Sequence, residues 1–209
     1  AGRVLVCDAC RAELPAHPAL CCPVCALPGT SDGRCAACRA APPAFDASLA
    51  VFDYRFPLDV MLQALKYGHR LALARFFGEA LRERASARAA AADLIVPMPL
   101  HRRRLQERGF NQAVEVARPL ARACGVPLEL DRLRRVRDPP AQATLARAER
   151  LGNLRGAFRC DAELSGLRIV VVDDVMTTGA SLDAVARCLK ERGAARVENL
   201  VLARTPSPD

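Results

Sequence analysis

The segment 169–181, IVVVDDVMTTGAS, places two adjacent carboxylates and a hydroxyl-rich turn after an apolar run. A buried strand here would bring Asp173 and Asp174 to the carboxyl edge of a sheet, where open parallel sheets bind ligands. The turn would direct backbone N–H groups, at the positive end of the next helix, toward one point that suits a phosphate. Its residues are Thr177, Thr178, Gly179, Ala180 and Ser181. Carboxylates repel a phosphate, but they accept hydrogen bonds from a ribose diol. The segment therefore predicts a site for a ribose 5-phosphate unit.

Cysteines are concentrated near the N-terminus. Seven of the ten lie within the first 38 residues, and six of these form C-x-x-C pairs. We expect no secretory signal, so the clustering favours metal binding over disulfides. Two such pairs supply four thiolates to a tetrahedral Zn²⁺, and the set with suitable spacing is Cys22, Cys25, Cys35 and Cys38. This site would be structural, because four thiolates leave no open position for catalysis.

The third pair, Cys7 and Cys10, has no second pair of its own. It is a second candidate metal site, and a quartet with Cys22 and Cys25 is the alternative. His17 is a further candidate ligand. A segment with so few large apolar residues forms little core, so metal binding would supply its folding energy.

An arginine-dense segment, HRRRLQERGFNQ at 101–112, follows a short strand expected at 94–96. We expect a loop here. Guanidinium groups bind phosphate oxygens in a bidentate manner, so the segment supplies four candidate anion ligands, Arg102, Arg103, Arg104 and Arg108. The alternative is a solvated basic turn that binds nothing.

The rest of the chain alternates strand and helix signals, which predicts an α/β domain with a mainly parallel sheet. Strands are expected at 47–54, 94–96, 126–133, 155–160, 168–172 and 197–202. Helices are expected at 57–68, 70–91, 111–123 and 180–192. Pro42 and Pro43 mark a boundary between a small domain at 1–44 and a larger one at 45–209. The patternless polar segment 134–153 is typical of a mobile functional loop.

Composition narrows the class of protein. The 209 residues carry a net charge of +8, and Lys66 and Lys190 are the only lysines among 31 basic residues. Such a charge favours a polyanionic partner, although a biased composition explains the arginines equally well. The apolar and charged fractions, 51% and 26%, exclude wholesale disorder. A run of about 18 apolar residues is absent, which excludes a membrane-spanning helix.

Four features occur in an order that resembles the ComF/GntX family of double-zinc-ribbon, phosphoribosyltransferase-like proteins. They are the cysteine pairs, PMPLHRRRLQERGFNQA at 97–113, Q-x2-L-x4-R-x2-N at 142–153, and the strand, acid pair and T-T-G-x-S turn at 169–181. The last matches the phosphoribosyl pyrophosphate (PRPP) motif of type I phosphoribosyltransferases. The resemblance covers essentially the whole chain, and R-G-F-N-Q is its most family-specific piece. The family carries a further upstream cysteine pair, which this sequence lacks.

The resemblance implies a type I phosphoribosyltransferase fold with a small N-terminal zinc ribbon. It assigns Asp173 and Asp174 to the catalytic centre, on the ribose 2′ and 3′ hydroxyls, and 177–181 to the 5′-phosphate. The segment from Pro97 to about Arg104 would be the pyrophosphate loop, and Mg²⁺ would accompany PRPP. The segment 134–153 would close over the ligand, and its family-matching residues are Gln142, Arg147, Arg150 and Asn153.

The implied function is PRPP binding in the service of DNA uptake and natural transformation, in the cytoplasm. The implied partners are single-stranded DNA and a DNA-translocating helicase. Aromatic residues make up only 4% of the chain, so DNA affinity would be mainly electrostatic. The alternative is an active enzyme that transfers ribose 5-phosphate from PRPP to a nitrogen acceptor and releases pyrophosphate. Because no motif identifies an acceptor, the sequence leaves the question of catalysis open. A third interpretation is a non-enzymatic scaffold that docks a partner protein.

Overall fold

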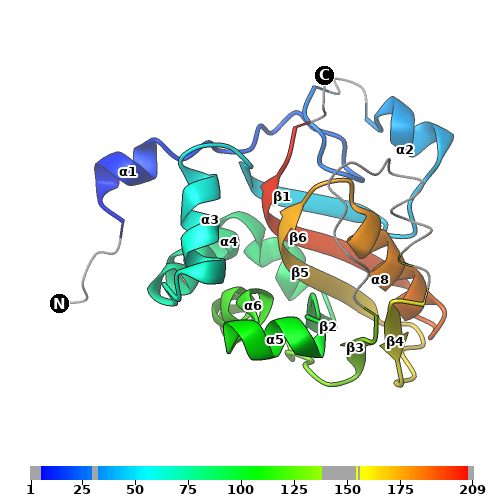
Figure 1. The fold of residues 1–209 in the computed structure, drawn as a ribbon. Helices are drawn as coiled ribbons and strands as arrows, with labels where there is room; N and C mark the ends of the chain where they lie inside the picture. The colour runs from blue at the N-terminus through cyan, green and yellow to red at the C-terminus, as the bar shows by residue number, and fades with distance from the viewer. Residues whose placement is uncertain (1–5, 30–32, 138–153, 155, 207–209) are drawn as a thin grey trace.

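A computed structural model describes residues 6–29, 33–137, 154 and 156–206. Its centre is a parallel sheet of four strands in the order β1-β6-β5-β2 (Figure 1). The strands are β1 (Ala47–Asp53), β2 (Leu94–Pro97), β5 (Arg168–Met176) and β6 (Arg196–Arg204). The predicted parallel α/β sheet is therefore confirmed.

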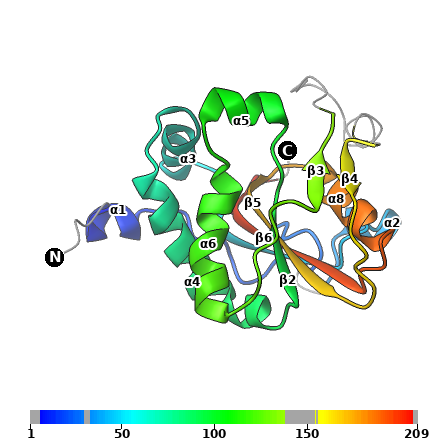
Figure 2. The same cartoon turned by 90° about the horizontal axis from the view of Figure 1, so that it is seen from below.

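Helices cover both faces of this sheet, as Figure 2 shows. Helices α3 (Leu58–Tyr67), α4 (Ala72–Ala90) and α6 (Gln112–Cys124) lie on one side, and α8 (Ala180–Lys190) lies on the other. Strand β5 contributes to both apolar clusters: Val170 and Val172 pack toward the three helices, whereas Ile169 and Val171 pack toward α8. This alternation follows from the two-residue period of a strand, and it explains why β5 is apolar on both faces.

The predicted helices begin and end close to the residues that the sequence indicates. The Asn111 side chain accepts a hydrogen bond from the Ala113 N–H at 2.9 Å at the start of α6, which ends at Gly125 with a left-handed φ of 67°. A side-chain acceptor at the start and a glycine at the end are the usual signals of helix termini.

Two predictions about the middle of the chain are wrong. The arginine-dense segment forms a helix, α5 (Arg102–Arg108), because its straight-chain residues favour helix and its ends are well capped, by His101 and by Gly109. The strand expected at 126–133 is reduced to an isolated bridge between Leu128 and Ile95. The chain then enters β3 (Leu133–Arg135), which pairs antiparallel with β4 (Phe158–Cys160) in a separate two-stranded sheet.

The N-terminal segment packs directly on the sheet. It contains two short helices, α1 (Asp8–Ala12) and α2 (Ala36–Ala40). The Ser48 N–H in β1 donates to the Pro23 carbonyl at 3.0 Å, and the buried cysteines of this segment share one apolar cluster with Phe45 and Val201. Residues on the two sides of the proposed boundary at 44 therefore contribute to a common core.

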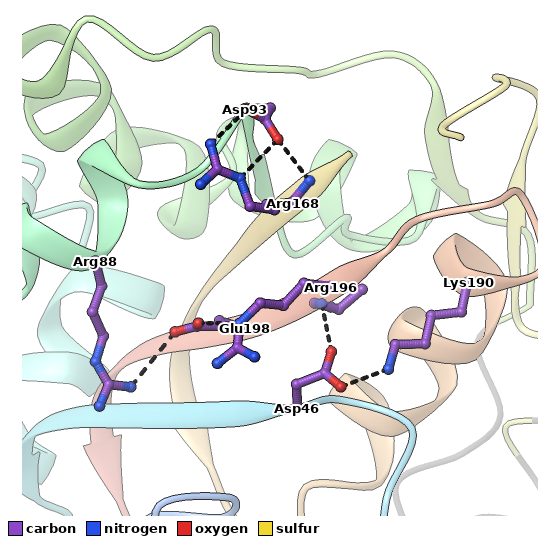
Figure 3. A network of polar contacts seen from close by, with 8 residues as sticks. Asp46, Arg88, Asp93, Arg168, Lys190, Arg196 and Glu198 are labelled. Atoms are coloured by element: carbon purple, nitrogen blue, oxygen red, sulfur yellow. Dashed lines mark hydrogen bonds and ion pairs between the residues drawn. The ribbon is translucent and has the colours of Figure 1, made fainter. Parts of the chain in front are cut away.

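The amino ends of the strands are joined by ion pairs (Figure 3). Asp46 accepts hydrogen bonds from Lys190 Nζ and from the Val197 N–H, each at 2.8 Å. Asp93 pairs with Arg168, whose hydrogen bonds lower the pKa of this carboxyl to about 2. These contacts hold the strand starts together, and the predicted ligand site lies at the opposite edge. Within the described ranges, no helix combines the length and the apolar character that a membrane span requires.

Candidate functional site

The acid pair lies inside β5 instead of following it. The strand continues to Met176, and Asp173 is in register with Val201 of β6. Both carboxylates are buried. Asp173 Oδ1 accepts from the Asp174 N–H, and Asp174 Oδ1 accepts from the Val175 N–H, each at 2.8 Å. Continued pairing with β6 therefore fixes both acids near the carboxyl edge of the sheet.

Lys66, near the end of α3, forms an ion pair with this acid pair. Its Nζ lies 2.6 Å from Asp174 Oδ2, and the two side chains are 19% and 7% exposed. Gln112 Nε2 donates to the same oxygen at 3.4 Å. Sequence reasoning missed Lys66, although a lysine is conspicuous in a chain whose basic residues are otherwise almost all arginine.

Burial is the largest influence on the pKa values of Asp173 and Lys66. The pKa of Asp173 is raised well above its usual value, first by desolvation and then by the negative charge of Asp174. Burial also disfavours the Lys66 ammonium, but the attraction of Asp174 and Asp173 outweighs that cost and raises the pKa of Lys66. The raised pKa of Asp173 favours its neutral form, and the raised pKa of Lys66 favours its charged form.

The turn after β5 has the shape that the sequence predicts. Thr177 is exposed, Thr178 and Ser181 are half-buried, and Gly179 has a φ of +78° that favours glycine. A Cβ at Gly179 would also lie 2.8 Å from the Met176 methyl carbon. Helix α8 begins at Ala180, so the first-turn N–H groups have no acceptor within the helix. The Ala180 N–H donates to Thr178 Oγ1 at 3.4 Å, so the other N–H groups of the first turn are the ones that could bind an anion.

Arg204, at the end of β6, forms hydrogen bonds with the backbone where β5 passes into this turn. It is buried, and Nη1 donates to the carbonyl oxygens of Met176 at 3.2 Å and Thr177 at 2.6 Å. Its Nε donates to the Cys25 carbonyl at 2.9 Å. One guanidinium group thus connects the N-terminal cysteine segment to the turn, a contact between residues 179 positions apart that no local pattern indicates.

Four cysteine sulfurs converge in the N-terminal segment. The Sγ atoms of Cys22, Cys25, Cys35 and Cys38 lie within 4.8 Å of one another, and all four residues are buried. Cys25 and Cys35 Sγ are 3.6 Å apart, close to the ~3.8 Å that tetrahedral Zn–S bonds require. Burial raises the pKa of Cys22, but backbone N–H donors, among them that of Cys35, outweigh it and lower the pKa to about 7. The residues present therefore fit a structural Zn²⁺.

Cys7 and Cys10 lie outside this quartet. Both are exposed on or beside α1, and among the residues that the structure describes they join no cluster of three or more metal-ligating side chains. The alternative quartet with Cys22 and Cys25 is therefore not the one that the fold assembles. His17 Nδ1 lies 2.7 Å from Asp53 Oδ1 instead of facing a metal site.

Known proteins with similar sequences share almost the full length of this chain. The "DNA utilization protein YhgH" of Salmonella typhi is 36% identical over 206 residues, which is 96% of this chain and 90% of that protein. This chain belongs to the ComF/GntX family. "Competence protein ComFC" of Bacillus subtilis is 30% identical over 208 residues, 96% of this chain and 84% of that protein. "Competence protein F" of Haemophilus influenzae is 28% identical over 179 residues, 82% and 78% of the two chains.

A phosphoribosyl transferase domain model matches residues 108–208. This ComF/GntX chain therefore has the expected phosphoribosyltransferase fold, a parallel sheet flanked by helices, with a cysteine quartet consistent with a zinc ribbon at its N-terminus. The match contains the acid pair, the turn and Arg204.

The four candidate arginines occupy different environments. Arg102 and Arg103 are exposed, Arg103 pairs with Glu107 at 2.9 Å, and Arg104 is half-buried. Arg108 is buried: its Nη1 donates to Gln112 Oε1 at 2.9 Å, and its Nη2 donates to the Tyr67 hydroxyl at 3.2 Å. Because Gln112 also donates to Asp174, Arg108 of the R-G-F-N-Q segment is connected to the acid pair. The loop residues Gln142, Arg147, Arg150 and Asn153 lie outside the described residues.

The acid pair offers carboxylate oxygens of the kind that Mg²⁺ prefers. Both Asp174 oxygens, however, already have partners, Lys66 and the Val175 N–H. A Mg²⁺ ion at Asp174 would therefore have to compete with the Lys66 ammonium.

Proposed function

We propose that this ComF/GntX protein binds PRPP at residues 173–181 and acts in the handling of DNA taken up by the cell. Asp173 and Asp174 accept hydrogen bonds from the ribose diol, and the turn 177–181 holds the 5′-phosphate with its N–H groups and hydroxyls. The observation that carries the proposal is that the acid pair at the end of β5 is followed directly by a glycine-containing turn at the start of α8. An acid pair alone would repel a phosphate, whereas the two together suit a phosphorylated sugar.

The chain's own groups have separate tasks in this proposal. The turn binds and orients the phosphate, the acids orient the sugar ring, and Arg108 supplies positive charge near the acids. Mg²⁺, when bound with PRPP, neutralises the pyrophosphate oxygens. Catalysis of transfer to a nitrogen acceptor stays a prediction from the sequence.

Isothermal titration calorimetry of the zinc-loaded chain with PRPP tests the binding. We expect saturable binding of one PRPP per chain, which strengthens when Mg²⁺ is present because the pyrophosphate charge is then neutralised. Adenosine, a riboside without a phosphate, is the control and is expected to give no saturable heat, since it cannot occupy the turn. The absence of heat with PRPP, both with and without Mg²⁺, would contradict the proposal.

The relatives' names and the charge of +8 support nucleic acid as a second ligand. We expect single-stranded DNA to bind with an affinity that falls by about tenfold or more between ~50 and ~200 mM salt, because counterions are released at each phosphate contact. Fluorescence anisotropy with a labelled oligonucleotide measures this dependence. Affinity that does not change with salt, or no affinity, would remove DNA from the proposal. The helicase partner stays a prediction.

A further inference from the structure

The acids that are proposed to hold a sugar diol are already neutralised from within the chain. Lys66 Nζ lies 2.6 Å from Asp174 Oδ2, on a helix that precedes the acid pair by more than a hundred residues. Asp174 is 7% exposed. A hydroxyl can therefore reach this oxygen only if Lys66 shares it or moves aside.

Contacts among Tyr67, Arg108 and Gln112 surround the Lys66–Asp174 ion pair. Lys66 lies one residue before Tyr67, whose ring stacks under the Arg108 guanidinium at 4.9 Å and whose hydroxyl accepts from it at 3.2 Å. Arg108 in turn holds Gln112, which shares Asp174 Oδ2 with Lys66. The end of α3, α5 and the start of α6 thus converge on one carboxylate. Two cations, Lys66 and Arg108, lie in a cluster with two acids, one of them biased toward its neutral form.

We propose that Lys66 is the built-in counter-cation of the acid pair, a positioning residue that lets a phosphorylated pentose bind beside these acids without a divalent cation. This rests on the proposed function for its ligand class. Without Lys66, an uncompensated carboxylate would stand next to the phosphate turn and repel the ligand. The same carboxylate would then attract a divalent cation, since carboxylate oxygens are its preferred ligands.

The second lysine of the chain provides a matched control. Lys190 Nζ pairs with Asp46 at 2.8 Å, and both side chains are partly exposed. The pair lies at the amino ends of the strands (Figure 3), the opposite edge of the sheet from the acid pair. Lys190→Met therefore removes one lysine and one ion pair without touching the site.

The first measurement needs no sugar ligand. Mn²⁺ alone is titrated into the native chain, Lys66→Met, Lys66→Gln and Lys190→Met, and binding is followed by electron paramagnetic resonance of free Mn²⁺. We expect both Lys66 variants to gain a Mn²⁺ site at least about tenfold tighter than any in the native chain, because the carboxylate loses its cation. Lys190→Met should resemble the native chain. Lys66→Gln keeps a hydrogen-bond donor and serves if Lys66→Met does not fold.

The second measurement uses ribose 5-phosphate in calorimetry, first in EDTA and then with Mg²⁺. In EDTA we expect the native chain and Lys66→Arg to bind, and Lys66→Met to lose about tenfold or more in affinity. Mg²⁺ should restore most of that loss in Lys66→Met and change native binding little.

The two measurements separate the two proposals. If Lys66→Met and Lys66→Gln gain no Mn²⁺ site, Lys66 is not the counter-cation, whatever the sugar phosphate does. If the native chain binds neither ribose 5-phosphate nor PRPP, the proposed function fails, and the Mn²⁺ titration still decides the role of Lys66.

Discussion

Asp174→Asn is expected to abolish PRPP binding and to lower the free energy of unfolding by about 3 kcal/mol. Two separate causes act. The amide no longer presents a carboxylate to a sugar hydroxyl, and the largely buried Lys66 ammonium loses its counter-charge. The stability loss should fall at the low end for buried ion pairs, because the Lys66 side chain is 19% exposed.

A second substitution separates stability from binding. In Asp174→Asn with Lys66→Met, no unpaired charge remains, and we expect stability within about 1 kcal/mol of the native chain. PRPP binding should stay lost. Urea denaturation and calorimetry provide the two measurements. Asp93→Asn is the matched control, because it removes a carboxylate from an ion pair at the opposite edge and should leave PRPP affinity unchanged. If the double variant recovered PRPP binding, the acid pair could not be the diol site.

Cys38→Ser is expected to release the zinc and to destabilise the whole chain. A tetrahedral site that loses one of four thiolates binds Zn²⁺ far more weakly, and structural zinc contributes roughly 10 kcal/mol or more to small metal domains. Because the quartet shares an apolar cluster with Phe45 and Val201, the damage should extend beyond the N-terminal segment. We expect native protein to carry one zinc per chain by mass spectrometry, and the variant to carry none and to unfold at a lower temperature.

Cys21→Ser is the control for this experiment. Cys21 is adjacent to Cys22 in the sequence and half-exposed, but it is not part of the quartet. The substitution should leave zinc content and unfolding temperature unchanged. Equal zinc loss from both variants would show that the quartet is assigned wrongly, and loss of zinc without any change in unfolding would show that the metal has no structural role.

Local patterns were sufficient for the features that depend on short segments. The apolar run before Asp173, the turn with Gly179 and the C-x-x-C spacing each specify their structure within about fifteen residues. The turn forms because glycine allows its positive φ, and the quartet forms because paired cysteines bring two thiolates together. These are local causes, and a sequence displays them directly.

Contacts between distant segments could not be found in this way. Lys66 meets Asp174, and Arg204 meets Cys25, only because the parallel sheet brings separate helices and loops to one edge. The arginine-dense segment was misjudged for a related reason. Its many arginines indicate an exposed segment that binds anions, but they do not determine its conformation. The conformation follows from helix propensity and from the caps His101 and Gly109.

The guanidinium group of Arg204 links the zinc site to the proposed phosphate-binding turn. Its Nε donates a hydrogen bond to the carbonyl of Cys25, a member of the cysteine quartet, and its Nη1 donates to the carbonyls of Met176 and Thr177 at the start of the turn. If zinc binding orders these contacts and so raises the affinity of the turn for a phosphorylated ligand, then that ligand must raise the affinity for zinc by the same factor. A shortage of zinc would therefore weaken the binding of the sugar phosphate as well as the stability of the fold.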